Sequence, residues 1–115
     1  MMFPKFDYVR SEKLLVACRA IACQHCGQDD GTVVAAHSNE AIHGKGRSIK
    51  ASDIYVASLC HHCHMALDQG SQMTKAERQT VWLTAHLKTV TQLVKRGLWP
   101  TGVPQPDFAT YSIAT

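Results

Sequence analysis

The sequence predicts an α+β fold: a small core of two strands and a helix, with one helix before it and a long helix after it. Two Cys-x-x-Cys pairs stand at residues 23–26 and 60–63. Between them, residues 32–37 and 54–59 are short apolar runs with β-branched residues, typical of buried strands. A chain of 115 residues supports one domain with a modest hydrophobic core. Two cysteine pairs that clamp one metal ion would stabilise such a core, so we expect a structural zinc.

The first predicted helix runs from Ser11 to about Ala22, after an irregular arm at residues 1–9. Ser11 is a suitable N-cap, because its hydroxyl can accept a hydrogen bond from a backbone N–H of the first turn. The apolar residues of this helix recur at spacings that share one face: Leu14, Leu15, Cys18 and Ile21. The helix leads directly into the first cysteine pair.

The segment between the cysteine pairs is predicted to be two strands joined by a long loop. Residues 28–31, Gln-Asp-Asp-Gly, have the composition of a turn. The strand at 32–37 ends at His37, and residues 38–53 show little periodicity, as expected of a loop. The strand at 54–59 then leads into the second cysteine pair, so the two strands can pair as a hairpin.

Two helices are expected after the second strand. The first covers residues 61–69 and ends at Gly70. The second covers about 74–96, because Thr74 and Glu77 have the spacing of a capping box. Its predicted core face comprises Leu83, Leu87, Val90 and Val94, with Trp82, His86 and Leu93 beside that face.

The C-terminal tail, residues 98–115, contains three prolines and little periodicity, so we expect it to be extended. Its aromatic residues, Trp99, Phe108 and Tyr111, are expected to contact the domain. The sequence has no internal repeat and no sign of a second domain. The whole chain is therefore interpreted as one domain, with its core at about residues 18–69.

Composition narrows the class of protein. A hydrophobic fraction of 45% and a charged fraction of 18% are typical of a soluble globular protein rather than a disordered one. No apolar run approaches the roughly 18–20 residues that span a bilayer, and the first seven residues lack the features of a secretory signal. We therefore expect a reducing cytoplasm and no membrane partner. Five cysteines, an odd number, fit a four-ligand metal site with one spare better than a set of disulfides. The net charge of +3 permits a polyanionic partner without requiring one.

The cysteine spacing predicts a closed metal site. The four expected ligands are Cys23, Cys26, Cys60 and Cys63, which complete a tetrahedral thiolate shell typical of structural zinc. Residues 27–59 separate the pairs, more than the roughly 15–20 residues of a plain zinc ribbon, and leave room for a functional insertion. Cys18 fits two interpretations: a buried apolar residue of the first helix, or a ligand in place of Cys23.

The residues around this framework resemble the HNH, or ββα-metal, endonucleases that carry a structural zinc. The shared features are Ala36-His37 at a strand end, Gly44-Lys45-Gly46, Lys50, Asp53, and Cys-x-x-Cys-His from Cys60 to His64. The resemblance is strongest to small phage and prophage nucleases and to the phage recombination-enhancement nuclease Ref, and it covers about residues 18–69. It implies a ββα-metal core and metal-dependent hydrolysis of DNA in a bacterial host cell. It also implies a role in DNA recombination or processing, with a recombination protein as a partner.

The resemblance assigns roles to individual residues. His37 is expected to be the general base, for which a pKa near 6.5 is suitable at neutral pH. His64 and Asp68, four residues apart on one face of a predicted helix, are expected to hold Mg²⁺ or another divalent ion. Asp53 is expected to orient the base or join the metal shell. Ala36 departs from the family, where this position often carries a metal ligand. Two alternatives stay open: Asp68 as a solvated helix residue, and His64 as a zinc ligand replacing a cysteine.

The loop after the first strand carries a concentration of basic residues. His43, Lys45, Arg47 and Lys50 are expected to contact DNA phosphates, with weak dependence on base sequence. The alternative is an ordinary solvated loop with His43 on its surface. For the whole chain, the second hypothesis is a non-catalytic zinc module that binds nucleic acid or protein through a degenerate HNH site. The oligomeric state is left open.

Overall fold

A computed structural model describes residues 8–70 and 72–106 of the chain. Its elements, in chain order, are α1 (Glu12–Arg19), β1 (Val34–His37), the short 3-10 helix η1 (Ala41–His43), β2 (Val56–Leu59), α2 (His61–Gln69) and α3 (Lys75–Lys95). The two strands pair antiparallel, with Val34 opposite Leu59 and His37 opposite Val56. The predicted α+β class is confirmed. No helix in the described part of the chain combines the length and apolar character that crossing a membrane requires.

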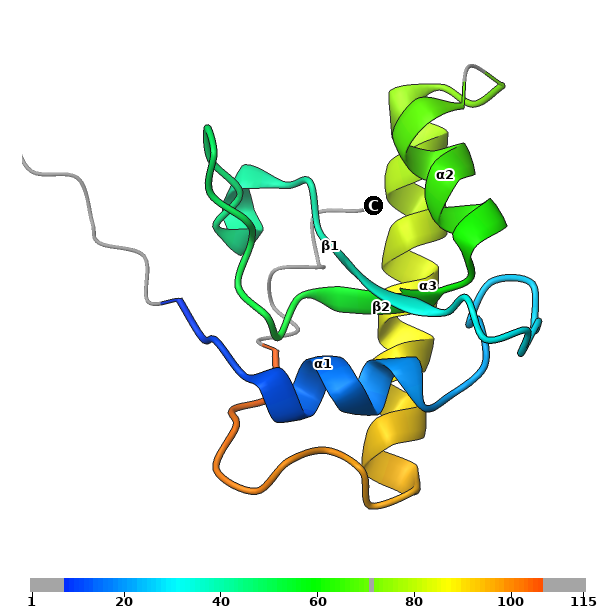
Figure 1. Cartoon of the computed structure of the whole chain (residues 1–115). Helices are drawn as coiled ribbons and strands as arrows, with labels where there is room; N and C mark the ends of the chain where they lie inside the picture. Colours follow the sequence, from blue (N-terminus) through cyan, green and yellow to red (C-terminus); the bar gives the residue numbers. More distant parts are fainter. Residues whose placement is uncertain (1–7, 71, 107–115) are drawn as a thin grey trace, which may run out of the picture.

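The helices surround the small sheet. Figure 1 shows α1 lying across one side of the sheet and α3 passing behind it, with α2 beside the first half of α3. α1 packs against both strands, and α3 packs mainly against β2. Two strands alone would leave most of their surface in water, so the flanking helices supply the burial that stabilises the hairpin.

α1 begins where the sequence predicts and ends slightly earlier. The Ser11 side chain accepts a hydrogen bond from the backbone N–H of Leu14, which confirms Ser11 as the N-cap. The helix ends at Arg19 rather than near Ala22. On its inner face, Leu14 and Cys18 are fully buried.

The face of α3 that enters the core differs from the predicted one. The capping box of Thr74 and Glu77 is present as predicted. The buried residues of the helix are Ala85, His86, Thr89, Val90 and Leu93, whereas Val94 is 44% exposed. Polar residues occupy this face because they satisfy backbone groups of β2. The Thr89 hydroxyl accepts from the Ser58 N–H, and His86 Nδ1 donates to the Val56 carbonyl. The spacing of apolar residues alone therefore predicted the wrong core face for α3.

The core consists of two buried clusters that meet at Trp82. One cluster surrounds the cysteines at the α2 end of the sheet, and the other lies between α1, β2 and α3. Trp82 packs against both, and its ring stacks on His86 with centroids 4.8 Å apart. Its Nε1–H donates to the Ala36 carbonyl at 3.0 Å. This bond ties α3 to the end of β1.

The beginning of the C-terminal tail follows the prediction. Gly97, in the left-handed region with φ of 70°, ends α3, and Trp99 then packs against the second cluster. The Trp99 Nε1–H donates to the Val103 carbonyl at 2.8 Å. The predicted contacts of Phe108 and Tyr111 fall outside the described residues.

Candidate functional site

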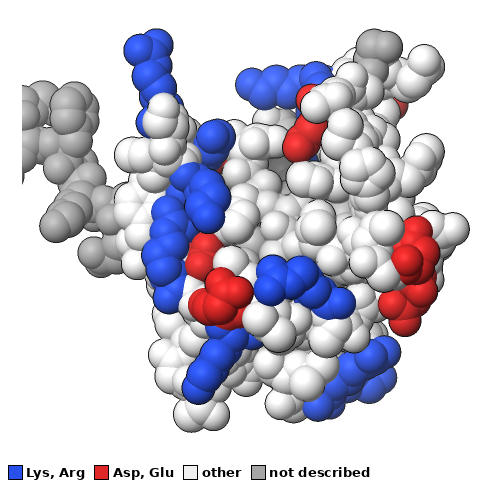
Figure 2. Space-filling model, viewed as in Figure 1, with Lys and Arg blue, Asp and Glu red and all other residues white. Residues whose placement is uncertain are grey.

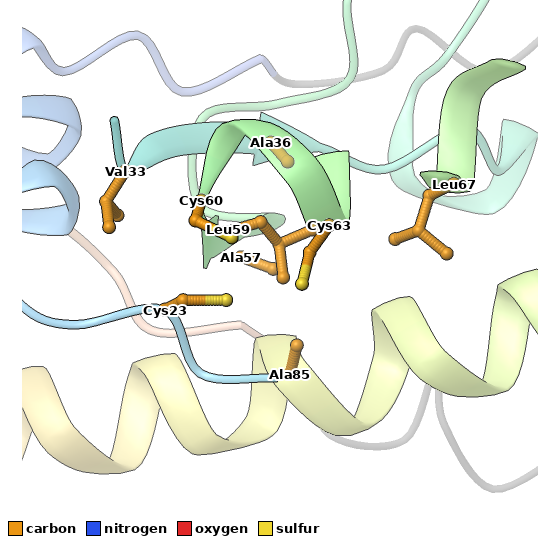
Figure 3. Packing of buried hydrophobic residues seen from close by; sticks show 9 residues of the cluster. All are labelled: Cys23, Val33, Ala36, Ala57, Leu59, Cys60, Cys63, Leu67 and Ala85. Carbon is orange, nitrogen blue, oxygen red and sulfur yellow. The ribbon is translucent and has the colours of Figure 1, made fainter. Parts of the chain in front are cut away.

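Four cysteines converge at the end of the sheet. Cys23 and Cys26 lie on the turn that follows α1, Cys60 is the N-cap residue of α2, and Cys63 lies in the first turn of α2. Their four Sγ atoms all lie within 4.8 Å of one another, and those of Cys26 and Cys60 are 3.6 Å apart. Figure 3 shows the sulfurs of Cys23, Cys60 and Cys63 pointing toward one another.

This sulfur cluster fits a tetrahedral zinc ion. Bonds of about 2.3 Å in a tetrahedron put neighbouring sulfurs about 3.8 Å apart, close to the separation of Cys26 and Cys60. Burial opposes ionisation of Cys23, but hydrogen bonds from the backbone N–H groups of Cys26, Cys60 and His25 lower the pKa of this thiol overall. The turn that supplies the first and last of these, Cys26 and His25, is closed by Gly27, whose φ of 84° suits glycine. The cluster can therefore hold a structural metal such as zinc.

Cys18 lies apart from this cluster. It is fully buried against α3 and β2, and the Ser58 hydroxyl donates to its backbone carbonyl at 2.7 Å. Burial raises the pKa of the Cys18 thiol to about 11. Of the two interpretations of Cys18, the structure therefore supports the buried apolar residue, since Cys23 occupies the position in the cluster. His64 is likewise not a member of the cluster.

A second site is a cleft of about 420 Å³ beside the sheet, with both polar and apolar lining residues. Its first wall is the end of β1 and the residues after it, from Ala36 to Glu40. Its second wall is α2, and its third is the first two turns of α3. His37, His64 and Asp68, which the sequence assigned to one catalytic site, all line this cleft. Figure 2 shows Lys and Arg side chains on both flanks of this face, over the loop of residues 44–50 and over the start of α3.

His37 is held by a buried carboxylate. Its Nε2 lies 2.8 Å from Oδ1 of Asp53, and Asp53 is 3% exposed. Asp53 also accepts from the Ser11 backbone N–H at 2.8 Å and from Arg10 at 3.3 Å. Burial opposes the ionised form of Asp53, but the bond from His37, the bond from Ser11 and the nearby positive charges lower the pKa of this carboxyl overall. An ionised carboxylate can only accept, so His37 must carry its proton on Nε2, which leaves Nδ1 of the neutral ring as a proton acceptor.

His64 and Asp68 form a pair on α2. His64 Nε2 and Asp68 Oδ2 are 3.1 Å apart, and both side chains are partly exposed to the cleft. A nitrogen and a carboxylate oxygen in this arrangement can serve as two ligands of a divalent ion. Within the described residues, however, the four cysteines are the one group of three or more such ligands that lie together. Any ion on His64 and Asp68 would therefore complete its shell with water or substrate oxygens.

The structure corrects the assignment of His43. This side chain is 3% exposed, and its Nδ1 lies 2.6 Å from the Ser38 hydroxyl. Its ring stacks on Tyr55 with centroids 4.2 Å apart. Burial lowers the pKa of His43 to about 4, so the ring is neutral at pH 7. His43 is therefore a buried residue that supports the loop: it neither contacts a DNA phosphate nor lies on the loop surface, the two positions considered for it.

The other basic residues of the loop point away from the core but do not line the cleft. Lys45, Arg47 and Lys50 are exposed, on a narrow turn in which Gly46 and Ile49 form a bridge. The cations that do line the cleft are Lys75 and Arg78, both on α3. Sequence reasoning missed this pair; the available signal was their spacing of three residues on a helix that starts just after the HNH-like segment.

The cleft therefore combines a supported histidine, a His/Asp pair and two cations, and Glu40 also lines it. Asp53 lies behind His37 rather than among the ligands of the His/Asp pair. Comparisons of the chain with protein-family models, curated proteins and solved structures found no match.

Proposed function

We propose that the protein is a metal-dependent endonuclease of HNH type that hydrolyses phosphodiester bonds of DNA. One observation carries the proposal: His37, His64 and Asp68 line a single cleft, although 26 residues of chain separate the two histidines. The order of strand, loop, strand and helix, with a cysteine cluster at its end, adds support. The resemblance to phage and prophage enzymes extends the proposal to a role in DNA recombination or processing.

In the proposed reaction, His37 is the general base. Nδ1 accepts a proton from a water molecule, and the oxygen of that water forms a bond to phosphorus. The bond between phosphorus and the leaving oxygen breaks, and the leaving oxygen takes a proton from solvent. Asp53 keeps the proton on Nε2 of His37 and stabilises the imidazolium that forms. A divalent ion on His64 and Asp68 would stabilise the negative charge of the phosphate and leaving oxygen.

Plasmid cleavage tests this function. Zinc-loaded protein is incubated with supercoiled DNA and Mg²⁺ or Mn²⁺, beside His37→Ala and the matched control His62→Ala. His62 is exposed on α2 and does not line the cleft. We expect the His37 substitution to reduce the nicking rate by about 10²–10⁴-fold, the usual contribution of a general base, with the control unchanged. Equal nicking by the wild type and His37→Ala would refute the assignment.

The second candidate function is a non-catalytic zinc module that binds nucleic acid or protein. Ala36 and the two-ligand His64/Asp68 pair favour it, because a shell with few protein ligands holds a divalent ion weakly. Folded, zinc-loaded wild-type protein that binds DNA but does not nick it with either ion would support this candidate over the nuclease.

A further inference from the structure

The start of α3 brings two cations into the cleft. Lys75 and Arg78 are three residues apart on α3, so their side chains project from the same side of the helix. Both line the cleft, together with Gln79 and with His37 from β1. The sequence had assigned DNA contacts only to the loop of residues 43–50, which is a separate part of the surface.

The charges of Lys75 and Arg78 are not balanced by ion pairs in the part of the chain that the structure describes. Across residues 8–70 and 72–106, no carboxylate lies within ion-pair distance of Lys75 or Arg78. Glu77, the acid nearest in sequence, is bonded to the backbone N–H of Thr74 in the capping box. Asp68 lines the same cleft but is paired with His64. Glu40 also lines the cleft, but it forms no ion pair with either cation. Lys75 and Arg78 can therefore bind an anionic ligand.

A hydrogen bond fixes the position of this pair relative to His37. Trp82 lies one helical turn after Arg78, and its Nε1–H donates to the carbonyl of Ala36, the residue before His37. Stacking on buried His86 holds the Trp82 ring. The α3 wall is therefore tied to the strand that carries the base. A guanidinium in this setting can bind two oxygens of one phosphate.

We propose that Lys75 and Arg78 form a phosphate-binding site on the α3 wall, so that a DNA strand lies in the cleft between α3 and the end of β1. The identification of the anion as DNA rests on the proposed function, whereas the anion site rests on the cleft geometry. Phosphates on this wall would hold the strand beside His37. The exposed cations of the loop would then attract DNA without positioning the bond that is cut.

Binding measurements separate this site from general attraction. The affinity of a fluorescent single strand of twelve nucleotides, and of its duplex, is measured by anisotropy with zinc-loaded protein and no other divalent ion. The variant Lys75→Gln/Arg78→Gln is compared with Lys88→Gln/Arg96→Gln. The control makes the same change of charge at two exposed residues away from the cleft, Lys88 on α3 and Arg96 at its C-cap. Zinc content and urea unfolding establish that both variants are folded.

We expect the Lys75/Arg78 variant to bind at least about 10-fold more weakly. The dependence of log affinity on log salt should also lose about 1.4–1.8 of its slope, for two lost phosphate contacts. The Lys88/Arg96 control should stay within about 2-fold of wild type. Equal weakening in both variants, no weakening in the first, or no DNA binding by the wild type would overturn the proposal. If dTMP competes with the same affinity as the oligonucleotide, the ligand of this site is a free nucleotide. That result would overturn the proposal that a DNA strand lies in the cleft.

The outcome is distinguishable from that of the nuclease proposal. If the wild type does not nick plasmid but the Lys75/Arg78 variant selectively loses binding, the phosphate site stands and the nuclease fails. If the wild type nicks plasmid and the Lys75/Arg78 variant binds and nicks normally, the phosphate site fails and the nuclease stands.

Discussion

Replacing Asp53 with asparagine tests the link between the fold and the proposed base. Asp53 is 3% exposed and accepts hydrogen bonds from His37, Ser11 and Arg10. Asparagine has nearly the same size, but one of its two terminal groups is an NH₂ donor. At least one of the three donors would then face another donor, and the negative charge beside Arg10 and His37 would be lost.

The expected loss of stability follows from these contacts. A hydrogen bond to a charged group contributes roughly 1.5–3 kcal/mol, and a buried donor left without an acceptor costs about 1–3 kcal/mol. We therefore expect Asp53→Asn to lower the free energy of unfolding by about 3 kcal/mol. Domains of this kind typically have about 5–15 kcal/mol, so the variant should still fold. Asp30→Asn is the matched control, because Asp30 also accepts from its neighbour Thr32 but is exposed, and its loss should be much smaller.

Two measurements test the effects of Asp53→Asn on stability and on the His37 tautomer. Urea unfolding gives the change in stability for both variants. Nitrogen-15 NMR of the imidazole ring should find the His37 proton on Nε2 in the wild type, and a loss of that preference in Asp53→Asn. Nicking should fall by about 10²–10⁴-fold, since the proton-accepting nitrogen would no longer be defined. Unchanged unfolding and an unchanged His37 tautomer in Asp53→Asn would refute the positioning role of Asp53.

Three further predictions concern metal, pH and capping. Metal analysis should find about one zinc per chain, and Cys60→Ser or a chelator should unfold the protein. The control variant Cys18→Ala should keep its zinc. A stable metal-free domain would contradict the zinc site. Lowering the pH from 7 to 5 should cost about 2 kcal/mol for each of His43 and His86. Burial lowers the pKa of each ring in the folded protein to about 4, whereas the same histidine in the unfolded chain has a pKa of 6.5. Between pH 7 and 5 the two histidines are therefore protonated mainly in the unfolded state, which stabilises that state. Urea unfolding at both pH values with saturating zinc measures this loss, and His86→Phe should remove about half of it; an unchanged pH dependence would count against burial of the ring. Thr74→Ala should lower stability by about 1 kcal/mol in urea unfolding, because it removes the N-cap of α3, and no change would mean that the cap is not formed in solution.

The features that the sequence predicted well are those encoded locally. An N-cap, a capping box and a Cys-x-x-Cys turn each depend on residues within four positions of one another. The starts of α1 after Ser11 and of α3 after Thr74 followed from such signals. The core face of α3 did not, because its buried Thr89 and His86 are polar. Hydrogen bonds to β2 stabilise their burial, and the spacing of apolar residues does not reveal these bonds. Burial of His43 likewise depends on Tyr55, which lies across the hairpin.

The candidate site likewise has some features that local spacing predicts and others that depend on tertiary packing. His64 and Asp68 share a helix face by spacing alone, so their pairing was foreseeable. The approach of Asp53 to His37 closes a loop of 15 intervening residues, and the sequence could only offer orientation of the base as one of two roles. The contributions of Arg10 and Arg78 come from elements outside the HNH-like segment. Their positions depend on tertiary packing, which no local pattern records.

The metal cluster and the cleft share α2, and this determines how metal dependence should be interpreted. Cys60 precedes the first turn of α2 and Cys63 points into the sulfur cluster, while His64, the next residue, lines the cleft. A zinc ion on the cysteines would therefore fix the helix that positions His64 relative to His37. Removing zinc should abolish both folding and nicking, even though no zinc ligand faces the proposed substrate. Loss of nicking after a chelator removes zinc would thus reflect unfolding and would not show that zinc takes part in the reaction. Dependence on added Mg²⁺ or Mn²⁺ at constant zinc is the observation that bears on the chemistry.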